Sequence, residues 1–240
     1  MNVLAELRSF VRAALVDPVP RDHHESDRAF LRRRVVAAVT LVAGAAILAW
    51  ALRIEPGDPT FYVATFGLAG VWTLGAVASG RLHLGWGHTR SGSRQARPVV
   101  QSLALGGLLL ALFMAGAVVV AQVPFLSEPV QQLLDHASAG SLAIVTVVTI
   151  VNGIAEELYF RGGLYAGVGR RHAVAVTTVV YALVTATSGI PLLVLAAAVV
   201  GLVVGLQRRV TGGILGPIVT HLTWSLGMLY LLPPVLDRLS

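Results

Sequence analysis

The chain contains no cysteine and no lysine among its 240 residues. Without cysteine, disulfides, cysteine nucleophiles and cysteine metal sites are excluded, while the cellular compartment stays open. Charged residues are also scarce, at 12% of the chain, and aromatic residues make up only 7%. A basic face interleaved with aromatic side chains, which is typical of nucleic-acid binding, is not found. The sequence therefore predicts no nucleic-acid partner.

The sequence is rich in apolar residues. They make up 55% of the chain, and the mean hydropathy is +0.76, far from the balance of a soluble domain. Most of the apolar segments approach the ~20 residues that a helix needs to cross a bilayer. The segments are Val35–Leu52, Phe61–Gly80, Val99–Ala121, Ser141–Ile154 with its continuation, Ala173–Ser188, Leu192–Leu206 and Gly213–Leu232. The predicted fold class is all-α, a polytopic membrane bundle of about seven transmembrane helices.

The fifth and sixth of these segments are short. Only Gly189, Ile190 and Pro191 separate them. They are interpreted either as two crossings joined by a tight turn or as a partly re-entrant pair.

The distribution of arginine predicts the orientation of the bundle. All 18 basic residues are arginine, and 15 of them fall in loops on one side. The opposite loops carry only Arg53 and Arg238, together with the acidic residues Glu55, Asp58, Glu128, Asp135 and Asp237. By the positive-inside rule we expect a cytoplasmic N-terminus and, after seven spans, a C-terminus outside. The arginine-only, alanine- and valine-rich composition is typical of a bacterium of high GC content, so the predicted location is the cell (plasma) membrane.

The first 34 residues form a separate segment in this scheme, ahead of a transmembrane domain over residues 35–240. Charged residues interrupt any apolar core in this segment, so it does not resemble a secretory signal. Apolar residues recur instead at helical spacing: Leu4, Leu7, Val11, Ala14 and Leu15. This pattern predicts either an amphipathic helix on the cytoplasmic leaflet, ended by Pro18 and Pro20, or a cytoplasmic tail without a dedicated role.

The stretch N-G-I-A-E-E-L-Y-F-R-G-G, residues 152–163, places charged groups inside an apolar span. Glu156 precedes Arg170, at the expected membrane surface, by 14 residues, or about 20 Å of helix. An ionisable group at this depth is costly unless it faces protein or water, which makes it a functional candidate. Glu157 and Arg161 are spaced i,i+4 with the acid first, so we expect them to pair. The alternative is a buried ion pair that only holds helices together.

Glu156 points about 100° away from Glu157 on an ideal helix. It shares a face with Asn152 and has no cation within reach on its own helix. A partly desolvated carboxylate without a cation is suited to act as a general base or acid near neutrality.

Two later segments bring polar groups to a similar depth. Counted from the arginines at the expected membrane surface, Thr185 and His221 lie at nearly the level of Glu156. Tyr181 shares a helix face with Thr185, and Ser225 shares one with His221. We therefore expect three helices to bring polar side chains together within the membrane.

These residues carry a resemblance to a known family. E-E-L-Y-F-R-G, Glu156–Gly162, resembles the first motif, E-E-x-x-x-R, of the CAAX-protease and bacteriocin-processing (CPBP or Abi) family of intramembrane endopeptidases. Gly212–Ser225 is similar to the third motif, H-x-x-x-N, with its glycine-rich turn and proline. The resemblance covers residues 141–232. Tyr181–Thr185 stands in place of the second motif, F-x-x-x-H, so threonine replaces the histidine, and Ser225 replaces the asparagine of the third motif.

The resemblance implies a glutamate-type endopeptidase. In such enzymes the first glutamate, here Glu156, activates water for attack on a peptide carbonyl, and Glu157 supports the helix. His221 is implied to orient the water or stabilise the oxyanion. Thr185 and Ser225 are assigned as hydrogen-bonding groups in the same site. Asn152 and Tyr181 are assigned supporting positions.

Other functions remain open at this point. The same polar cluster would suit a non-proteolytic membrane scaffold, immunity protein or partner protein. A catalytic zinc usually takes three protein ligands, and Glu156, Glu157 and His221 supply three only if Glu157 leaves Arg161, so a metal is disfavoured and no cofactor is expected. The expected partners are the lipid bilayer and an unknown peptide or membrane-protein substrate. The sequence predicts neither the substrate nor the oligomeric state.

Overall fold

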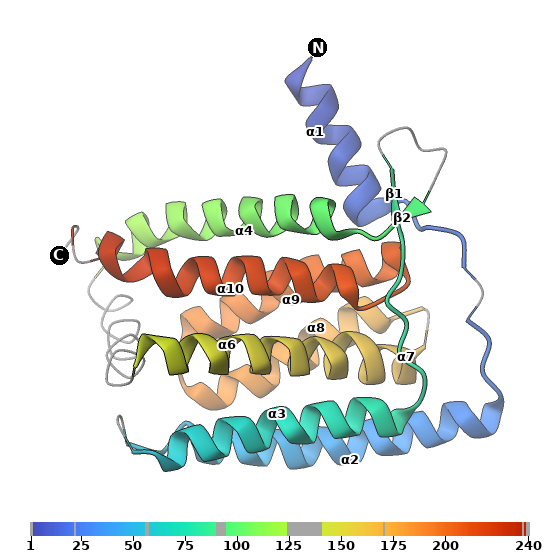
Figure 1. Ribbon diagram of the computed structural model, residues 1–240, viewed down its shortest axis with the longest axis horizontal. Coiled ribbons are helices and arrows are strands. Elements are labelled where there is room, and N and C mark those ends of the chain that lie inside the picture. The colour runs from blue at the N-terminus through green and yellow to red at the C-terminus, as the bar shows by residue number, and fades with distance from the viewer. Residues whose placement is uncertain are drawn as a thin grey trace.

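The computed structural model describes residues 2–21, 23–55, 58–89, 95–123, 141–169, 171–236 and 238. Its helices lie side by side in one bundle, with a short β-hairpin at one end (Figure 1). The long helices are α2 (Asp27–Ala51), α3 (Thr60–Ser79), α4 (Val99–Val120), α6 (Leu142–Glu156), α9 (Pro191–Thr211) and α10 (Leu215–Leu236). The predicted all-α, polytopic fold is confirmed.

Six helices among the described residues are long and apolar enough to cross a membrane. One of them is the continuous helix Leu142–Val168, which joins α6 to the π-helical segment η2 (Glu157–Leu164) and to α7 (Tyr165–Val168). The predicted sixth span is a full-length helix, α9, which is longer than the apolar pattern indicates. The predicted fifth span is shorter, since α8 (Ala173–Thr185) is followed only by the 3₁₀ turn η3 (Ala186–Ser188). The chain is a multi-pass membrane protein with six long helices and one short apolar helix in its described part.

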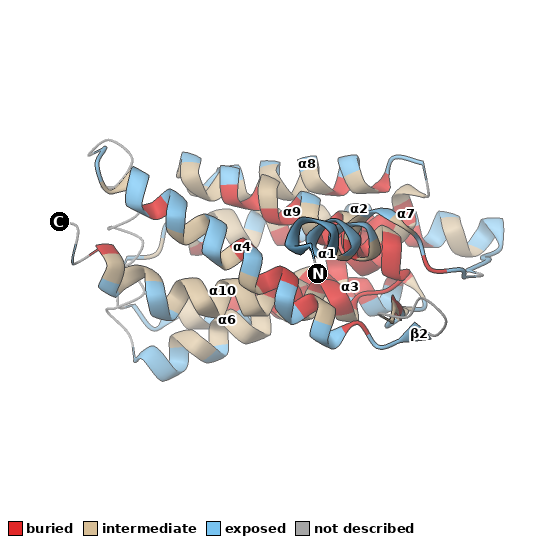
Figure 2. Ribbon diagram, turned by 90° about the horizontal axis from the view of Figure 1, so that it is seen from above, coloured by how far each residue is buried: buried red, intermediate tan, exposed pale blue. Residues whose placement is uncertain are grey.

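The outer faces of the helices carry large apolar side chains. Val63, Leu74 and Leu183 expose 70%, 72% and 65% of their surface. Side chains of this kind are stable on the outside of a bundle when lipid surrounds it. Figure 2 shows the buried residues gathered between the helices, mostly toward the end that carries α7.

The core of the bundle forms where α2, α3 and the continuous α6–η2 helix meet. Trp72 of α3 stacks on Tyr159 of η2, with ring centroids 4.4 Å apart. The Tyr159 hydroxyl donates a hydrogen bond of 2.6 Å to the carbonyl of Ala37 in α2. Because these contacts fix η2 from one side, its opposite side is turned toward α8, α9 and α10.

The N-terminal helix is present and extends away from the bundle in Figure 1. It consists of α1 (Val3–Val11) and the π turn η1 (Arg12–Val16). The residues that follow are bound to the bundle, since the amide of Val19 donates to the carbonyl of Val210, 2.9 Å away, and Ala14 and Val19 are buried. The N-terminal segment is thus attached to the end of α9, and its contact with a membrane surface stays a prediction.

The β-hairpin lies at the same end of the bundle. Its strands are β1 (Gly87–His88) and β2 (Gln95–Ala96), paired antiparallel. The loop before it, residues 80–86, crosses the turn between α9 and α10, where the amide of Ile214 donates to the carbonyl of His83. This loop ties the end of α3 to the start of α10.

The arginines that the sequence assigns to the cytoplasmic side are not all at the surface of the bundle. Arg33 is almost completely buried, and its Nε donates to Glu25 at 3.0 Å. Several charged residues used for the orientation lie outside the described residues: Arg90, Arg94, Glu128, Asp135, Arg170 and Asp237. The orientation of the bundle stays a prediction.

Candidate active site

The two adjacent glutamates lie where the helix changes its geometry. The regular α6 ends at Glu156, and Glu157 begins the π-helical segment η2. A π turn is wider than an α turn and is frequent at functional sites. Gly163 lets η2 approach α3, because a Cβ atom there would lie 3.0 Å from Ser79 Oγ.

Glu157 is completely buried and has two positively charged or chargeable partners. Its Oε1 lies 3.2 Å from Nη1 of Arg161, which is also completely buried. The predicted i,i+4 pair is therefore present. The same Oε1 lies 2.8 Å from Nδ1 of His221.

His221 comes from α10 and is buried. When the imidazole is neutral and Nδ1–H donates to Glu157, Nε2 is left as the acceptor nitrogen. The Nε2 atom has no hydrogen-bond partner among the described residues. Counting residues from the membrane surface predicted that His221 lies at the depth of the glutamates. It could not predict which glutamate His221 contacts, because depth does not depend on the rotation of a helix about its axis.

Glu156 has a different environment and is only partly buried. The hydroxyl of Tyr181 on α8 donates a hydrogen bond to its Oε2, at 2.6 Å. Within the described part of the chain, this neutral phenol is the hydrogen-bond partner of Glu156, and no cation is in salt-bridge contact with it.

The other predicted site residues make hydrogen bonds within their own helices. Thr185 donates to the carbonyl of Tyr181 at 3.0 Å, and Ser225 to that of Leu222 at 3.5 Å. Asn152 donates to the carbonyl of Val148 at 3.1 Å. Their roles in the site stay predictions.

Arg208 is a further buried group that sequence reasoning did not assign to the site. Its Nε donates to the carbonyl of Arg161 at 2.7 Å, and its guanidinium lies over the ring of Tyr165. Arg161 in turn lies over the ring of Tyr181, 4.8 Å from its centroid. In the sequence Arg208 stands beside Arg209 at the end of an apolar segment, where a membrane-surface arginine is expected, so nothing distinguishes it as buried.

Among the described residues, no group of three or more histidine, aspartate or glutamate side chains is arranged to hold a metal ion. Glu157 also keeps its contact with Arg161. The expectation that no metal takes part stays a prediction.

Comparison with known proteins identifies the part of the chain that holds this site. Residues 138–227 match a family model described as type II CAAX prenyl endopeptidase Rce1-like. The match includes Glu156, Glu157, Arg161 and His221, and it confirms the resemblance seen in the motifs. No curated protein and no solved structure matches the chain.

Proposed function

We propose, from the match of residues 138–227 to this model of type II CAAX prenyl endopeptidases, that the chain hydrolyses a peptide bond within the membrane, with Glu156 as the base that activates water. His221 is the second proton-transfer group in this proposal, and Tyr181 positions the Glu156 carboxylate. The substrate is a peptide or membrane protein that reaches the bundle from the bilayer. The family description makes a prenylated C-terminal peptide one candidate.

The difference between the two adjacent glutamates supports this assignment most strongly. Glu157 is in contact with Arg161 and His221, so its negative charge is balanced. Glu156 is held by an uncharged hydroxyl and keeps part of its surface accessible. A carboxylate that is not tied to a cation is the better proton acceptor. Of the two acids, Glu156 therefore fits the base.

The contact between Glu157 and His221 supports the second role. A buried carboxylate that accepts a hydrogen bond from Nδ1–H of a histidine fixes the tautomer and the orientation of the imidazole, as in hydrolases that use a histidine base. The proton that Glu156 takes from the attacking water passes to His221 Nε2, which donates it to the leaving amine as the C–N bond breaks. In this proposal Glu157 orients His221 in addition to supporting the helix.

Stabilisation of the oxyanion needs hydrogen-bond donors near the attacked carbonyl. The hydroxyls of Thr185 and Ser225 donate hydrogen bonds to backbone carbonyls of their own helices, so each side chain would have to rotate to donate to the oxyanion. We keep both as candidates for this role because each replaces a polar residue of the family motifs.

A second function is favoured by one observation. The position of the second-motif histidine is occupied by Thr185, whose hydroxyl bonds to the backbone and not to Glu156. A non-proteolytic relative, acting as a membrane scaffold, immunity protein or partner protein, would need only the buried Glu157–Arg161–His221 contacts. The alternatives differ in whether Glu156 must be able to take up a proton.

Substitution of Glu156 separates the two functions. Glu156→Gln keeps the size and the acceptor for Tyr181 but removes the base, so a protease loses its function and a scaffold keeps it. The measurement is rescue of a gene-deletion phenotype by each variant at equal abundance in the membrane. Glu55→Gln, at an exposed position outside the bundle core, is the matched control and is expected to rescue fully. Full rescue by Glu156→Gln would contradict the endopeptidase proposal.

A further inference from the structure

The candidate site divides the bundle into a closely packed half and a loosely packed half. From the site to the arginine-rich end, where α2 and α4 begin and α9 ends, many side chains between the helices are buried, among them Tyr159, Phe160 and Arg161 of η2. In the other half, every residue of α6 from Leu142 to Asn152 is at least partly exposed, and so is every residue of α10 from Leu222 to Val235. Figure 2 shows the same difference, since the buried residues gather toward the end that carries α7.

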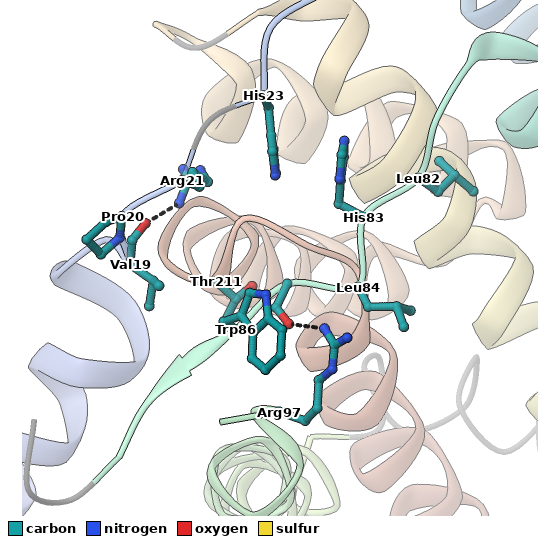
Figure 3. Close-up of a pocket in the computed structure, with 11 residues that line it drawn as sticks. Val19, Pro20, Arg21, His23, Leu82, His83, Leu84, Trp86, Arg97 and Thr211 are labelled. Carbon is teal, nitrogen blue, oxygen red and sulfur yellow. Dashed lines mark hydrogen bonds between the residues drawn. The ribbon is translucent and has the colours of Figure 1, made fainter. Parts of the chain in front are cut away.

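A cavity at the arginine-rich end is separate from the site. It has a volume of about 240 Å³ and is lined, among others, by Leu82 and Thr211 (Figure 3). Neither Glu156 nor His221 is among the described residues that line it. Gly162 of η2 packs against Leu82 on the side of the site, because a Cβ atom there would lie 2.8 Å from Leu82 Cδ2. The packed side chains of η2 thus lie between this cavity and the site.

A row of polar side chains runs along α6 through the loosely packed half. Thr149, Asn152 and Glu156 are spaced i, i+3 and i+7, so they lie on one face of the helix. Val147, on the opposite face, exposes 49% of its surface, as expected for a side chain that faces lipid. The polar face therefore points into the bundle.

Two packing contacts of α6 support this direction. Ala155 is buried in the core that α6 forms with α3, and a Cβ atom at Gly153 would lie 2.9 Å from Leu222 of α10. On an ideal helix the direction of Glu156 lies between those of Ala155 and Gly153. Glu156 accordingly meets Tyr181 of α8 between the helices.

A matching row of polar side chains lies on α8 and η3. Tyr181, Thr185 and Ser188 are spaced i, i+4 and i+7, and Ser188 stays on the face of Thr185 because three residues complete one turn of the 3₁₀ helix. Leu183, on the opposite face, exposes 65% of its surface. The hydrogen bond from Tyr181 to Glu156 joins the two rows at the site. Because α8 begins next to α7 and runs away from it, both rows lead from the site toward the end at which α6 begins (Figure 1).

The side chains of the two rows are more accessible than their inward direction predicts. Protein interiors are closely packed, so side chains that face the inside of a bundle are normally buried. Thr149, Asn152, Thr185 and Ser188 instead keep part of their surface accessible, as does Glu156. Space is therefore left between the rows, and polar groups at this depth in a membrane protein pair with one another or face water. A hydroxyl that donates to a backbone carbonyl, as those of Thr149 and Thr185 do, still offers lone pairs to water.

We propose that the two rows line a water-filled path that leads to Glu156 from the end of the bundle at which α6 begins. The water then comes from the side of the membrane opposite to the arginine-rich end. This inference deepens the proposed function, because hydrolysis consumes a water molecule at Glu156 and the path supplies it. It rests on that function for the use of the water, whereas the position of the path rests on the direction and exposure of the side chains.

The absence of native cysteine allows the path to be tested with single cysteine substitutions. The full-length protein in sealed vesicles is exposed to silver ions, which are small, charged and bind thiols, and the unreacted thiols are counted by alkylation and mass spectrometry after denaturation. We expect Thr149→Cys and Thr185→Cys to react about tenfold faster or more than Val147→Cys and Leu183→Cys, because thiolates form in water and ions do not enter hydrocarbon. Each control lies two residues from its partner, at a similar depth on the lipid-facing side of the same helix.

Two exposed positions mark the two sides of the membrane. Glu55→Cys lies just beyond the end of α2, on the side at which α6 begins, and Arg28→Cys lies at the arginine-rich end (Figure 1). With silver ions on one side of uniformly oriented vesicles, the path cysteines should react from the side on which Glu55→Cys reacts. The proposal is overturned if Thr149→Cys and Thr185→Cys react no faster than their lipid-facing controls, or if they react from the side of Arg28→Cys.

This test distinguishes a failure of the path from a failure of the proposed function. Labelling needs no substrate, so it reports on the path whether or not the chain is a protease. Unreactive path cysteines together with cleavage that depends on Glu156 would reject the path and keep the protease. Reactive path cysteines without any cleavage would keep the path and reject the protease. Ser188→Cys, in the same row as Thr185, replaces a variant that does not fold.

Discussion

Glu156 and Glu157 are neighbours in the chain, yet their side chains have different partners. Glu157 contacts Arg161 and His221, whereas Glu156 accepts a hydrogen bond from Tyr181. The backbone is helical at both residues, so their adjacent side chains point about 100° apart. The chemistry proposed for the site depends on this division between a charge-balanced acid and an accessible one.

Removal of the Tyr181 hydroxyl tests whether it positions the base. In Tyr181→Phe the ring remains, but the carboxylate loses its 2.6 Å hydrogen bond. We expect kcat for substrate cleavage in reconstituted vesicles to fall about 10- to 100-fold, with little change in KM, since one positioning hydrogen bond is lost. The matched control is Tyr230→Phe, whose hydroxyl bonds only to Thr146 among the described residues. Equal rates for the two variants would contradict a positioning role.

The two glutamates are expected to differ in their effect on stability. Glu157→Gln leaves Arg161 buried without its counter-charge, and we expect the free energy of unfolding to fall by about 3–5 kcal/mol. Glu156→Gln is expected to change it little, because that side chain is partly exposed and glutamine still accepts from Tyr181. Unfolding in mixed detergent micelles measures both. Similar losses in the two variants would show that the acids are not divided in this way.

Part of this site could be predicted from the sequence. The i,i+4 spacing was sufficient for the Glu157–Arg161 pair, and depth counting brought His221 to the same level. The bond from His221 to Glu157 and the bond from Tyr181 to Glu156 depend on how α8 and α10 are rotated about their axes. One sequence contains no measure of that rotation, so neither contact could be predicted.

At the scale of elements, the π-helical segment η2 depends on close packing against α3. Figure 1 shows α3 running alongside the continuous helix that contains α6. Gly163 faces α3, where a Cβ atom would lie 3.0 Å from Ser79 Oγ and 3.4 Å from Ala76 Cα. The contact with Ala76 is of ordinary length, but Ser79 Oγ would have to shift by a few tenths of an ångström, and it is held by hydrogen bonds to the carbonyl of Ala76 and from Nη1 of Arg33.

Gly163→Ala is therefore expected to destabilise the protein. The free energy of unfolding should fall by about 1–3 kcal/mol through overpacking. Gly70→Ala in α3 is the control, because a Cβ atom there has no neighbour within 4 Å. Alanine favours a helix over glycine by up to about 1 kcal/mol, so this variant should be as stable as wild type or more stable. A stability of Gly163→Ala equal to that of Gly70→Ala would contradict the close packing of η2.

The helices themselves were largely predictable, because apolar runs of this length rarely form anything but membrane-spanning helices. The ends of the helices were less predictable. Helix α2 begins at Asp27, ahead of the predicted Val35, and α9 continues to Thr211, beyond the predicted Leu206. These extensions include polar and charged residues that are buried by neighbouring segments. Hydropathy excludes such residues from a span, and it carries no signal for a π turn.

At the scale of the whole molecule, the arginine-rich end of the bundle is closed by contacts between distant segments. Arg33 of α2 binds Glu25 of the N-terminal segment, and its Nη1 donates to Ser79 at the end of α3. The Arg33 side chain is almost fully buried, so its partner carboxylate must be ionised to balance it.

This contact predicts a pH dependence of stability. The hydrogen bond from Arg33 holds the pKa of Glu25 below its ordinary value of 4.5. A lowered pKa in the folded state stabilises the protein above the ordinary value, and this contribution is lost as the pH falls from about 4.5 through the folded-state pKa. The difference in stability between wild type and Glu25→Gln should thus be largest near neutrality and shrink in acid. A difference that does not change with pH would contradict the prediction.

The measurement that tests the central claim most directly is a census of membrane-protein N-termini in cells that express wild-type protein, Glu156→Gln or Glu55→Gln at equal abundance. The proposal predicts at least one new N-terminus that is present with wild type and Glu55→Gln and absent with Glu156→Gln, and its sequence would identify the substrate. The same set of N-termini in all three, with Glu156→Gln still rescuing the deletion phenotype, would contradict proteolysis and leave the scaffold function.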